Sequence, residues 1–317
     1  MNDFSNNPIL SVVIPVYMEE ESIRPFLERV QPVLAGMDLS YEIIFALDPS
    51  TDHTEQVILE EAKVNKNIKL ITFSRRFGQP AATLAGIFIS RGDFCVVIDV
   101  DLQDPPELIE KMYSKLFEGY EVVYAKRRSR KGETVSKKLI SYIGYAFINR
   151  ISDVHIPRNT GDFRIMSRKV VDELRKLNES HGFLRGLVAF VGYPQGFVEY
   201  DRDSRFSGVG KYNRLIGSLR IGLNGLISFS SKPLFIMSII GFFISGTSFL
   251  LGALYLLQKL IGSNITPGLS TTVILISFFS GIQLLSLGLI GEYVGRIYDE
   301  VKRRPLYIVD KKINIED

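Results

Sequence analysis

Residues 94–106 read FCVVIDVDLQDPP, an apolar run that ends in a cluster of acidic side chains. The apolar part, Phe94 to Ile98, has the β-branched composition of a buried strand. Pro105 follows the acidic cluster, and proline is favoured in the first turn of a helix. The stretch therefore predicts a strand, then a polar loop, then a helix, which is the unit from which α/β folds are built.

Comparable apolar runs alternate with longer stretches of helical spacing elsewhere in the chain. They are Leu10 to Val16, Glu42 to Ala46, Lys69 to Phe73 and Val122 to Ala125. This alternation predicts an α/β domain with a mainly parallel sheet. Ligands of such sheets bind beyond the carboxyl ends of the strands, so the polar residues there are candidates for one site. They are Pro15 to Glu20, Asp48 to Asp52, Ser74 to Gly78 and Asp99 to Asp104.

Asp99 and Asp101 stand two residues apart, so an extended backbone directs both carboxylates to one face. Hard oxygen ligands of this kind suit Mg²⁺ or Mn²⁺, and such a cation would neutralise a diphosphate leaving group. Acidic strand ends are also often only solvated, and the pair of aspartates alone does not exclude that. Asp104, by contrast, is expected to be structural, because Pro105 and Glu107 complete the pattern of a helix N-cap and capping box.

The C-terminal third of the chain predicts membrane segments. The chain has 317 residues, 46% of them hydrophobic. Two uncharged apolar runs, Leu234 to Leu257 and Ser270 to Ile290, are each about 20 residues or longer, enough to cross a bilayer. Residues 1–8 lack the features of a secretory signal, so the part before these runs is expected to be cytoplasmic. Basic residues near 296–304 place the C-terminus on the same side by the positive-inside rule.

We expect four parts along the chain: a cytoplasmic domain at 1–210, interfacial amphipathic helices at 211–232, a two-helix transmembrane region at 233–295 and a cytoplasmic tail at 296–317. A further amphipathic stretch, 134–152, is expected either at the membrane surface or packed on the sheet. Basic clusters at 126–138 and 302–304 suit phosphates and anionic headgroups, or are solvated faces. Gly241, Gly246 and Gly252 predict close helix packing, within the chain or between subunits.

Several kinds of function find no support in the sequence. Cys95 is the only cysteine, so an internal disulfide is excluded, and its apolar surroundings predict a small buried side chain. His53, His155 and His181 lack metal-ligand spacing and are expected in solvated loops. We find no P-loop, no Ser-His-Asp order and no nucleic-acid-binding module, and we expect no nucleic-acid partner.

Two motifs carry a resemblance to a known family. The segments Ile14 to Glu20 and Asp99 to Pro106 resemble the family 2 inverting glycosyltransferases of the GT-A fold. Within that family the chain is similar to polyprenyl-phosphate glycosyltransferases of the bactoprenol glucosyltransferase type and, more distantly, to dolichyl-phosphate mannose synthase. Asn159 to Arg164, Gly291 to Tyr298 and the two C-terminal runs carry this narrower resemblance, which covers nearly the whole chain.

The resemblance implies three groups of site residues. The nucleotide-sugar group comprises Pro15, Tyr17, Glu19, Asp48, Arg75 and Asp99. The catalytic group comprises Asp101, Gln103 and Asp162, with Asp99 and Asp101 on the metal. The group for the acceptor phosphate comprises Arg127, Arg128, Arg130, Arg164, Arg202, Arg205 and Lys211. Without the resemblance, Asp162 reads as a turn-forming residue after Gly161.

The implied function is transfer of one hexose, with UDP-glucose as the favoured donor, to undecaprenyl phosphate at a bacterial inner membrane. A phosphate monoester is mostly dianionic at neutral pH, so it attacks without a general base, and a single displacement inverts the anomeric carbon. Alternative donors are UDP-N-acetylhexosamine, UDP-galactose, GDP-mannose and an amino-arabinose donor. Expected partners include further copies of the chain, with a tetramer as one option, and a flippase.

Two other classes compete with this reading. A processive polysaccharide synthase needs more membrane spans than this chain provides. A catalytically silent module that binds nucleotide-sugar is supported only by the altered turn at Pro49, whereas the presence of Asp99, Asp101, Gln103 and Asp162 favours activity. Other departures from the family pattern weaken the donor assignment: Met18 replaces Asn, and Arg76 and Gln79 replace Asn and Lys. Proline cannot adopt the positive φ that glycine allows, so the turn at Pro49 must differ from the family's.

Overall fold

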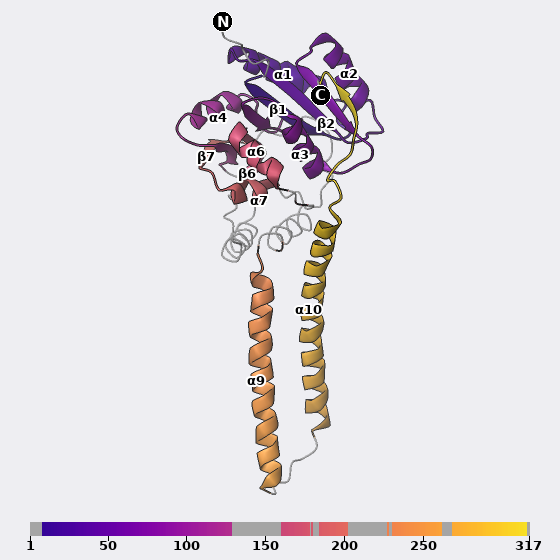
Figure 1. The fold of residues 1–317 in the computed structure, drawn as a ribbon, viewed down its shortest axis with the longest axis vertical. Helices are drawn as coiled ribbons and strands as arrows, with labels where there is room; N and C mark the ends of the chain where they lie inside the picture. The colour runs from indigo at the N-terminus through magenta and orange to yellow at the C-terminus, as the bar shows by residue number, and fades with distance from the viewer. Residues whose placement is uncertain are drawn as a thin grey trace.

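The computed structural model describes residues 8–128, 160–177, 179, 184–201, 227, 230–261 and 268–315. These residues form an α/β domain from which two long helices project side by side (Figure 1). The amphipathic stretch expected at 134–152 lies outside the described residues. So does the one expected at 211–232, apart from 227 and 230–232.

One mixed sheet forms the centre of the α/β domain. Its strands are β1 Leu10–Val16, β2 Tyr41–Leu47, β3 Ile68–Phe73, β4 Phe94–Val97, β5 Val122–Arg127, β6 Thr160–Ser167, β7 Gln195–Tyr200 and β8 Val309–Ile313. They are ordered β7-β5-β6-β4-β1-β2-β3-β8. The five strands predicted from the apolar runs are confirmed, each to within two residues at either end.

Strand direction brings β6 to the same edge of the sheet as the predicted site. Strands β1 to β4 are mutually parallel, and β6 pairs antiparallel with both β4 and β5. The amino end of β6 therefore lies at the edge where β4 and β5 end. Val97 is the register partner of Arg164, so continuing the register places Asp162 beside Asp99. We call this edge the carboxyl edge.

Helices cover both faces of the sheet. On one face lie α1 Ile23–Gly36, α2 Thr54–Val64 and α4 Leu108–Leu116, and on the other lie α3 Gln79–Ile89, α6 Arg168–Lys176 and α7 Leu184–Val191. Alternating strand residues supply the two cores, as period-2 side chains must. Helix α3 lies so close to β1 that a Cβ at Gly86 would come within 2.3 Å of Val13 Cγ1, so only glycine fits there.

Cys95 lies in the core beneath α3 and α6, as predicted. It is fully buried on β4, and burial raises the pKa of its thiol to about 12. A protonated, inaccessible thiol is a poor nucleophile. Cys95 is therefore a small core side chain.

The two long helices are α9, Lys232–Leu260, and α10, Leu269–Lys302. Each contains a stretch long and apolar enough to cross a membrane, at 232–254 and at 278–302. Large apolar side chains such as Phe242 and Phe249 are exposed along them. The prediction of two long apolar helices is confirmed. The second extends beyond the predicted Ile290, as far as Lys302.

Close helix packing at the predicted glycines is not found within the described part of the chain, and packing between subunits stays a prediction. A Cβ added at Gly241, Gly246 or Gly252 would meet no atom within 4 Å, so these glycines do not pack closely within the chain. The two helices are instead joined near the α/β domain, where the Tyr293 hydroxyl donates a hydrogen bond to the Ser230 carbonyl, 2.7 Å away.

The segment after α10 returns to the sheet, which the sequence analysis did not foresee. Strand β8 pairs antiparallel with β3 and forms one edge of the sheet (Figure 1). The Tyr307 ring packs edge-on against Phe73, with centroids 5.9 Å apart, and Asn314 donates hydrogen bonds to the carbonyls of Ala62 and Ile68. Residues 307–314 are thus part of the α/β domain, although the expected division set 296–317 apart as a tail.

Candidate active site at the carboxyl edge

The loop after β4 carries the two predicted metal ligands in a tight, strained turn. Asp101 is 7% exposed, and its Oδ1 accepts a hydrogen bond from the Gln103 amide nitrogen at 3.2 Å. Leu102, between them, has φ of +58°, a left-handed conformation that is unusual for leucine. Asp99 Oδ1 accepts a hydrogen bond from the Gln79 side chain at 2.9 Å. Backbone strain of this kind is concentrated at functional loops, because the surroundings must enforce it.

Asp104 is structural but is not the N-cap that the sequence predicts. Helix α4 begins at Leu108, and Glu107 occupies the N-cap position. The Asp104 carboxylate is buried, accepts a short hydrogen bond from the Tyr200 hydroxyl and lies 3.8 Å from the Arg127 guanidinium. Asp104 binds Tyr200 on β7 instead of capping α4. Asp104 therefore ties the loop after β4 to the ends of β5 and β7.

Hydrogen bonds from backbone amides of the loop after β1 to side chains that follow β2 hold these two loops together. Successive amide nitrogens of Met18 and Glu19 donate to the hydroxyls of Ser50 and Thr54, at 3.0 and 2.9 Å. Met18 adopts φ of +54°, so the left-handed residue of this region is Met18. The carboxylate of Glu19 in turn accepts a hydrogen bond from Ser22 at 3.0 Å. Glu19 is thus engaged in holding the loop.

Tyr17 presents an aromatic face beside this pair of loops. The Arg76 guanidinium carbon lies 3.8 Å from the centre of its ring. A flat ring stacked against a planar cation can exchange that partner for a planar base. Pro15 lies one step back, within β1, where it is buried opposite Ala46.

Asp48 secures the loop after β3. It is 1% exposed, and its two oxygens accept hydrogen bonds from the amide nitrogens of Phe77 and Gly78, at 2.9 and 2.8 Å. The exposed Arg75 guanidinium lies 4.0 Å from the centre of the Phe77 ring. Asp48 therefore fixes the backbone of the loop after β3 from the protein interior. Arg75 lies on the exposed side of the same loop, where the nucleotide is predicted to bind.

Arg127 and Arg128 follow β5 but differ in their surroundings. Arg127 Nε donates a hydrogen bond to the Tyr200 hydroxyl at 3.3 Å, and a Cβ at Gly161 would come within 3.0 Å of its Nη2. The absence of a side chain at Gly161 thus makes room for this guanidinium. The Arg128 side chain is 61% exposed and lies 3.9 Å from Glu199. Arg127 is a fixed cation at the site, and Arg128 is a surface cation.

Asp162 stands between two guanidinium groups at the start of β6. Its Oδ1 accepts hydrogen bonds from Arg164 Nη2 at 3.1 Å and from Arg185 Nε at 3.0 Å. Burial by itself raises the pKa of the Asp162 carboxyl, but Arg185 and Arg164 outweigh it and hold that pKa below its ordinary value. The carboxylate is consequently ionised at neutral pH.

Arg164 is completely buried, so it does not reach a surface where an acceptor phosphate would bind. Its Nε donates to the Asp162 carbonyl at 3.1 Å, and its guanidinium carbon lies 5.2 Å from the centre of the Tyr124 ring. Burial lowers the pKa of this guanidinium. The prediction that Arg164 touches the acceptor is not supported by its position; it acts on Asp162.

Arg185 is a site residue that the sequence analysis missed. It comes from α7, which is far from β6 in the sequence and contacts Asp162 only because of the fold. The available signal was a single arginine within the apolar stretch 183–191. A charged residue in such a stretch requires a partner when the helix is packed.

Comparison with known proteins identifies the family. Residues 11–175 match the family described as Glycosyl transferase family 2. The chain belongs to glycosyl transferase family 2. It is 46% identical over 307 residues to "Uncharacterized glycosyltransferase YkcC" of Bacillus subtilis, covering 97% of this chain and 95% of that protein. It is 38% identical over 300 residues to the bactoprenol glucosyl transferase of Shigella phage SfV, covering 95% and 97% of the two chains.

The fold of this family 2 glycosyltransferase is also found among solved structures. Glucosyl-3-phosphoglycerate synthase from Mycobacterium tuberculosis, solved with Mn²⁺, UDP-glucose and phosphoglyceric acid, matches with a TM-score of 0.50 at 20% identity. The match covers 70% of this chain and 79% of that one. The predicted GT-A-like α/β fold is confirmed, and the chain is a glycosyltransferase.

The remaining predicted residues of this glycosyltransferase lie outside the described part of the chain. They are Arg130, Arg202, Arg205 and Lys211. Gln103 is described, half-buried in the strained loop beside Asp101. Within the described residues no group of three or more His, Cys, Asp or Glu side chains is arranged to hold a metal ion by itself.

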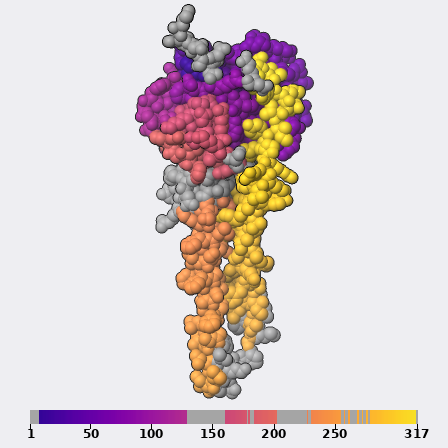
Figure 2. Space-filling model, in the orientation of Figure 1, coloured from indigo at the N-terminus to yellow at the C-terminus, as the bar shows by residue number. Residues whose placement is uncertain are grey.

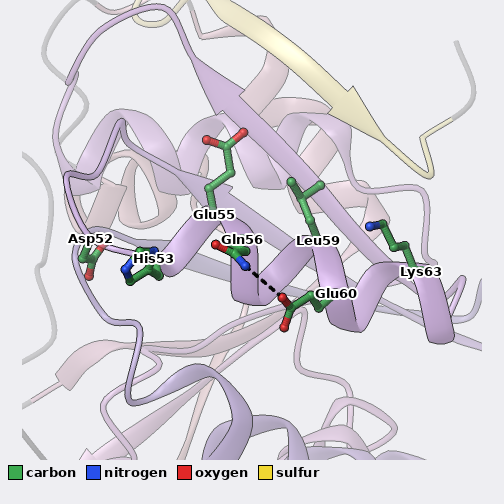
Figure 3. Close-up of a pocket in the computed structure, with 7 residues that line it drawn as sticks. All are labelled: Asp52, His53, Glu55, Gln56, Leu59, Glu60 and Lys63. Atoms are coloured by element: carbon green, nitrogen blue, oxygen red, sulfur yellow. Dashed lines mark hydrogen bonds between the residues drawn. The ribbon is translucent and has the colours of Figure 1, made fainter.

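A cavity of about 390 Å³ lies along α2 and extends to Asp52 in the loop after β2 (Figure 3). It is lined by Asp52, His53, Glu55, Gln56, Leu59, Glu60 and Lys63. Gln56 donates a hydrogen bond to Glu60, one turn further along α2, at 3.1 Å, and His53 is exposed, as predicted. Asp52, at the end of the segment predicted after β2, lines this cavity, but none of the residues assigned to nucleotide-sugar, catalysis or acceptor does.

Proposed function

We propose that this glycosyltransferase transfers one glucose from UDP-glucose to undecaprenyl phosphate and releases UDP. The acceptor oxygen attacks the anomeric carbon from the side opposite the diphosphate, so the configuration inverts. Relatives named bactoprenol glucosyl transferase support both the sugar and the lipid class. They match over nearly the full length of both chains, long helices included.

The observation that carries the proposal is the direction in which the carboxyl edge faces. Strand β8 starts at Val309, shortly after α10 ends at Lys302. Val309 is the register partner of Phe73 at the carboxyl end of β3. The candidate site therefore lies on the side of the sheet from which the long helices project (Figure 1). Figure 2 shows the two helices extending away from the α/β domain. A site facing a membrane anchor suits an acceptor whose phosphate sits at a bilayer surface.

The donor set at the loop after β4 fits a divalent cation. Asp99 and Asp101 offer carboxylate oxygens, the ligands that Mg²⁺ and Mn²⁺ prefer, and oxygens of the donor diphosphate would complete the coordination. A bound cation supplies charge stabilisation for the departing diphosphate. Gln79 orients Asp99, and the Gln103 amide orients Asp101. Gln103 is assigned to the donor sugar because its side chain belongs to the same loop.

The nucleotide and acceptor roles follow from exposure. Tyr17 and Arg75 offer an aromatic face and a cation to the nucleotide, while Pro15, Glu19 and Asp48 support them. Arg127, fixed by Tyr200 and Asp104, is the described cation best placed to hold a phosphate, since a guanidinium matches phosphate oxygens. Arg128, Arg130, Arg202, Arg205 and Lys211 stay assigned to the acceptor by resemblance.

The pairing of β8 with β3 supports one topology. Two membrane helices joined by a short connection return the chain to the side from which it started, and β8 completes the sheet on that side. The catalytic domain and the C-terminus are then both cytoplasmic in a bacterial inner membrane. Division into a catalytic domain, interfacial helices and a two-helix anchor stays as proposed, with 307–315 added to the catalytic domain. Oligomerisation, with a tetramer as one option, and a flippase partner complete the proposal.

The test is transfer of labelled sugar to undecaprenyl phosphate by the detergent-purified full chain. UDP-glucose, UDP-galactose, UDP-N-acetylglucosamine and GDP-mannose are offered in parallel, each with Mn²⁺, with Mg²⁺ or with a chelator. We expect metal-dependent label in the organic phase from UDP-glucose. Label from a different donor would correct the sugar. Nucleotide binding without label from any donor would favour the silent module instead.

A further inference from the structure

The Asp162 carboxylate is held at one oxygen only. Both guanidinium contacts, from Arg164 and Arg185, go to Oδ1. Within the described residues nothing donates a hydrogen bond to Oδ2, and 34% of the side chain is exposed. A carboxylate oxygen has two lone pairs, so Oδ2 is free to accept hydrogen bonds from a ligand.

Holding Asp162 in this way costs the protein stability. Arg164 is fully buried, and its Nη1 has no hydrogen-bond partner in the described part of the chain. The neighbouring Tyr124 hydroxyl is likewise buried and unpaired there. Buried polar groups left unsatisfied are rare and costly, and they persist where function requires them. Arg164 therefore orients Asp162 at the cost of a hydrogen bond of its own.

Arg185 reaches Asp162 from a rigid support. Its neighbours on α7, Leu184, Leu187 and Val188, are all buried in the core under the sheet. The helix therefore cannot turn without disrupting that core, and the Arg185 contact at 3.0 Å is fixed in direction. Two guanidinium groups from different elements thus determine where Oδ2 points.

The charge of Asp162 decides which ligand Oδ2 can take. An ionised carboxylate only accepts hydrogen bonds, and it repels a dianionic phosphate. The acceptor phosphate has no proton to donate at neutral pH, whereas the transferred sugar carries several hydroxyl groups. Extending the β4–β6 register by two residues beyond Val97 and Arg164 brings Asp162 to the level of Asp99, next to the proposed diphosphate position where the sugar must sit.

The geometry points to Asp162 Oδ2 as the acceptor of a hydrogen bond from a hydroxyl of the donor sugar, with Arg185 as the positioning residue that aims it. This inference rests on the proposed function, and it assigns the Asp162 carboxylate to donor recognition rather than to proton transfer or to the acceptor phosphate. Arg164 shares the task from within β6.

The test compares the binding of UDP-glucose with that of UDP by isothermal titration, using the detergent-purified full chain with Mn²⁺. The ratio of the two dissociation constants, compared between a variant and the unmodified protein, measures what the changed residue contributes to sugar binding, without requiring turnover. Loss of a hydrogen bond to a charged group predicts that Asp162→Asn weakens UDP-glucose binding relative to UDP binding by about 10-fold. The affinity for UDP itself should stay unchanged.

Variants of Arg185 separate positioning from folding. Arg185→Gln should reduce the sugar's contribution several-fold, and Arg185→Lys should restore part of it by replacing the charge without the guanidinium geometry. Arg24→Gln is the matched control, because Arg24 also contacts two carboxylates, Glu60 and Glu61 on α2, and is not one of the proposed site residues. It should bind both ligands as the unmodified protein does.

The outcomes separate the inference from the proposed function. A sugar contribution that disappears in Asp162→Asn, in a protein that transfers no glucose, would retain the inference and reject the proposed reaction. Equal ratios in the unmodified protein and in Asp162→Asn would overturn the inference even if transfer occurs. Failure to bind either nucleotide would overturn both.

Discussion

The two edges of the sheet differ in how completely their buried polar side chains are hydrogen-bonded. At the amino edge, where β1, β2 and β3 begin, Ser11 Oγ donates to Glu42 at 2.5 Å and Lys69 Nζ contacts the other Glu42 oxygen at 2.5 Å. At the carboxyl edge, Asp162 uses one oxygen, Arg164 leaves Nη1 unpaired among the described residues, and Leu102 is strained. Buried charge therefore occurs at both edges, and incomplete pairing, together with a left-handed leucine, distinguishes the edge proposed to be catalytic.

The largest effect is expected from breaking the carboxyl edge at Asp101. Asp101→Asn removes a charge from the proposed metal site, and transfer should fall by about 10²- to 10³-fold. The thermal midpoint should change little, because the Asn side-chain oxygen can still accept the Gln103 amide. Initial rates of lipid labelling and a melting curve on the same sample check both points. Transfer at the unmodified rate would remove Asp101 from the site.

Breaking the amino edge should cost stability and leave catalysis intact. Glu42 is 2% exposed, so Glu42→Gln leaves the Lys69 charge poorly compensated. Removal of one partner of a buried ion pair costs about 3 kcal/mol of unfolding free energy. Denaturant unfolding measures this loss. The kcat/KM of the folded fraction should stay within about 2-fold of the unmodified value, and a larger drop would contradict the assignment of function to the carboxyl edge alone.

A smaller effect is expected where Tyr200 links Asp104 and Arg127. Tyr200→Phe removes two buried hydrogen bonds and should cost about 1 to 2 kcal/mol. Burial, and then Asp104, raise the pKa of Tyr200 to about 12. Because its folded pKa exceeds the ordinary value near 10, the hydroxyl stabilises the fold fully below pH 10 and loses that effect as pH rises toward 12.

The comparison of Tyr200→Phe with the unmodified protein by urea unfolding at pH 8 and at pH 11 tests this dependence. The difference in unfolding free energy should be smaller at pH 11. A difference that grows with pH would mean that the hydroxyl is ionised more easily in the folded protein.

The smallest effect is expected at Met18, which takes a left-handed conformation at the carboxyl edge. Asparagine tolerates that conformation better than methionine, so Met18→Asn should raise the unfolding free energy by about 0.5 kcal/mol. The matched control is Met37→Asn, where φ is −80° and no such gain is expected. A loss of stability at Met18 equal to that at Met37 would show that the side chain's packing outweighs backbone strain.

Local patterns in the sequence were sufficient to predict the five strands and the polar loop after β4. The apolar runs that end in Asp48 and Asp99 determine strand ends by burial, which depends on neighbouring residues. The roles of Asp104 and Arg185 could not be predicted in this way, because Tyr200 and Asp162 reach them only through the fold. Strand β8 was missed for the same reason: residues 309–313 carry two lysines and an aspartate and resemble a solvated tail.

The order of synthesis gives the pairing of β8 with β3 a further meaning. Strand β3 emerges early, yet its partner β8 is synthesised only after both apolar helices. Until then one edge of the sheet exposes unpaired backbone groups, which is the kind of surface that promotes aggregation. Completion of the sheet therefore waits for the synthesis of α9 and α10, so the α/β domain cannot finish folding before both helices have been made.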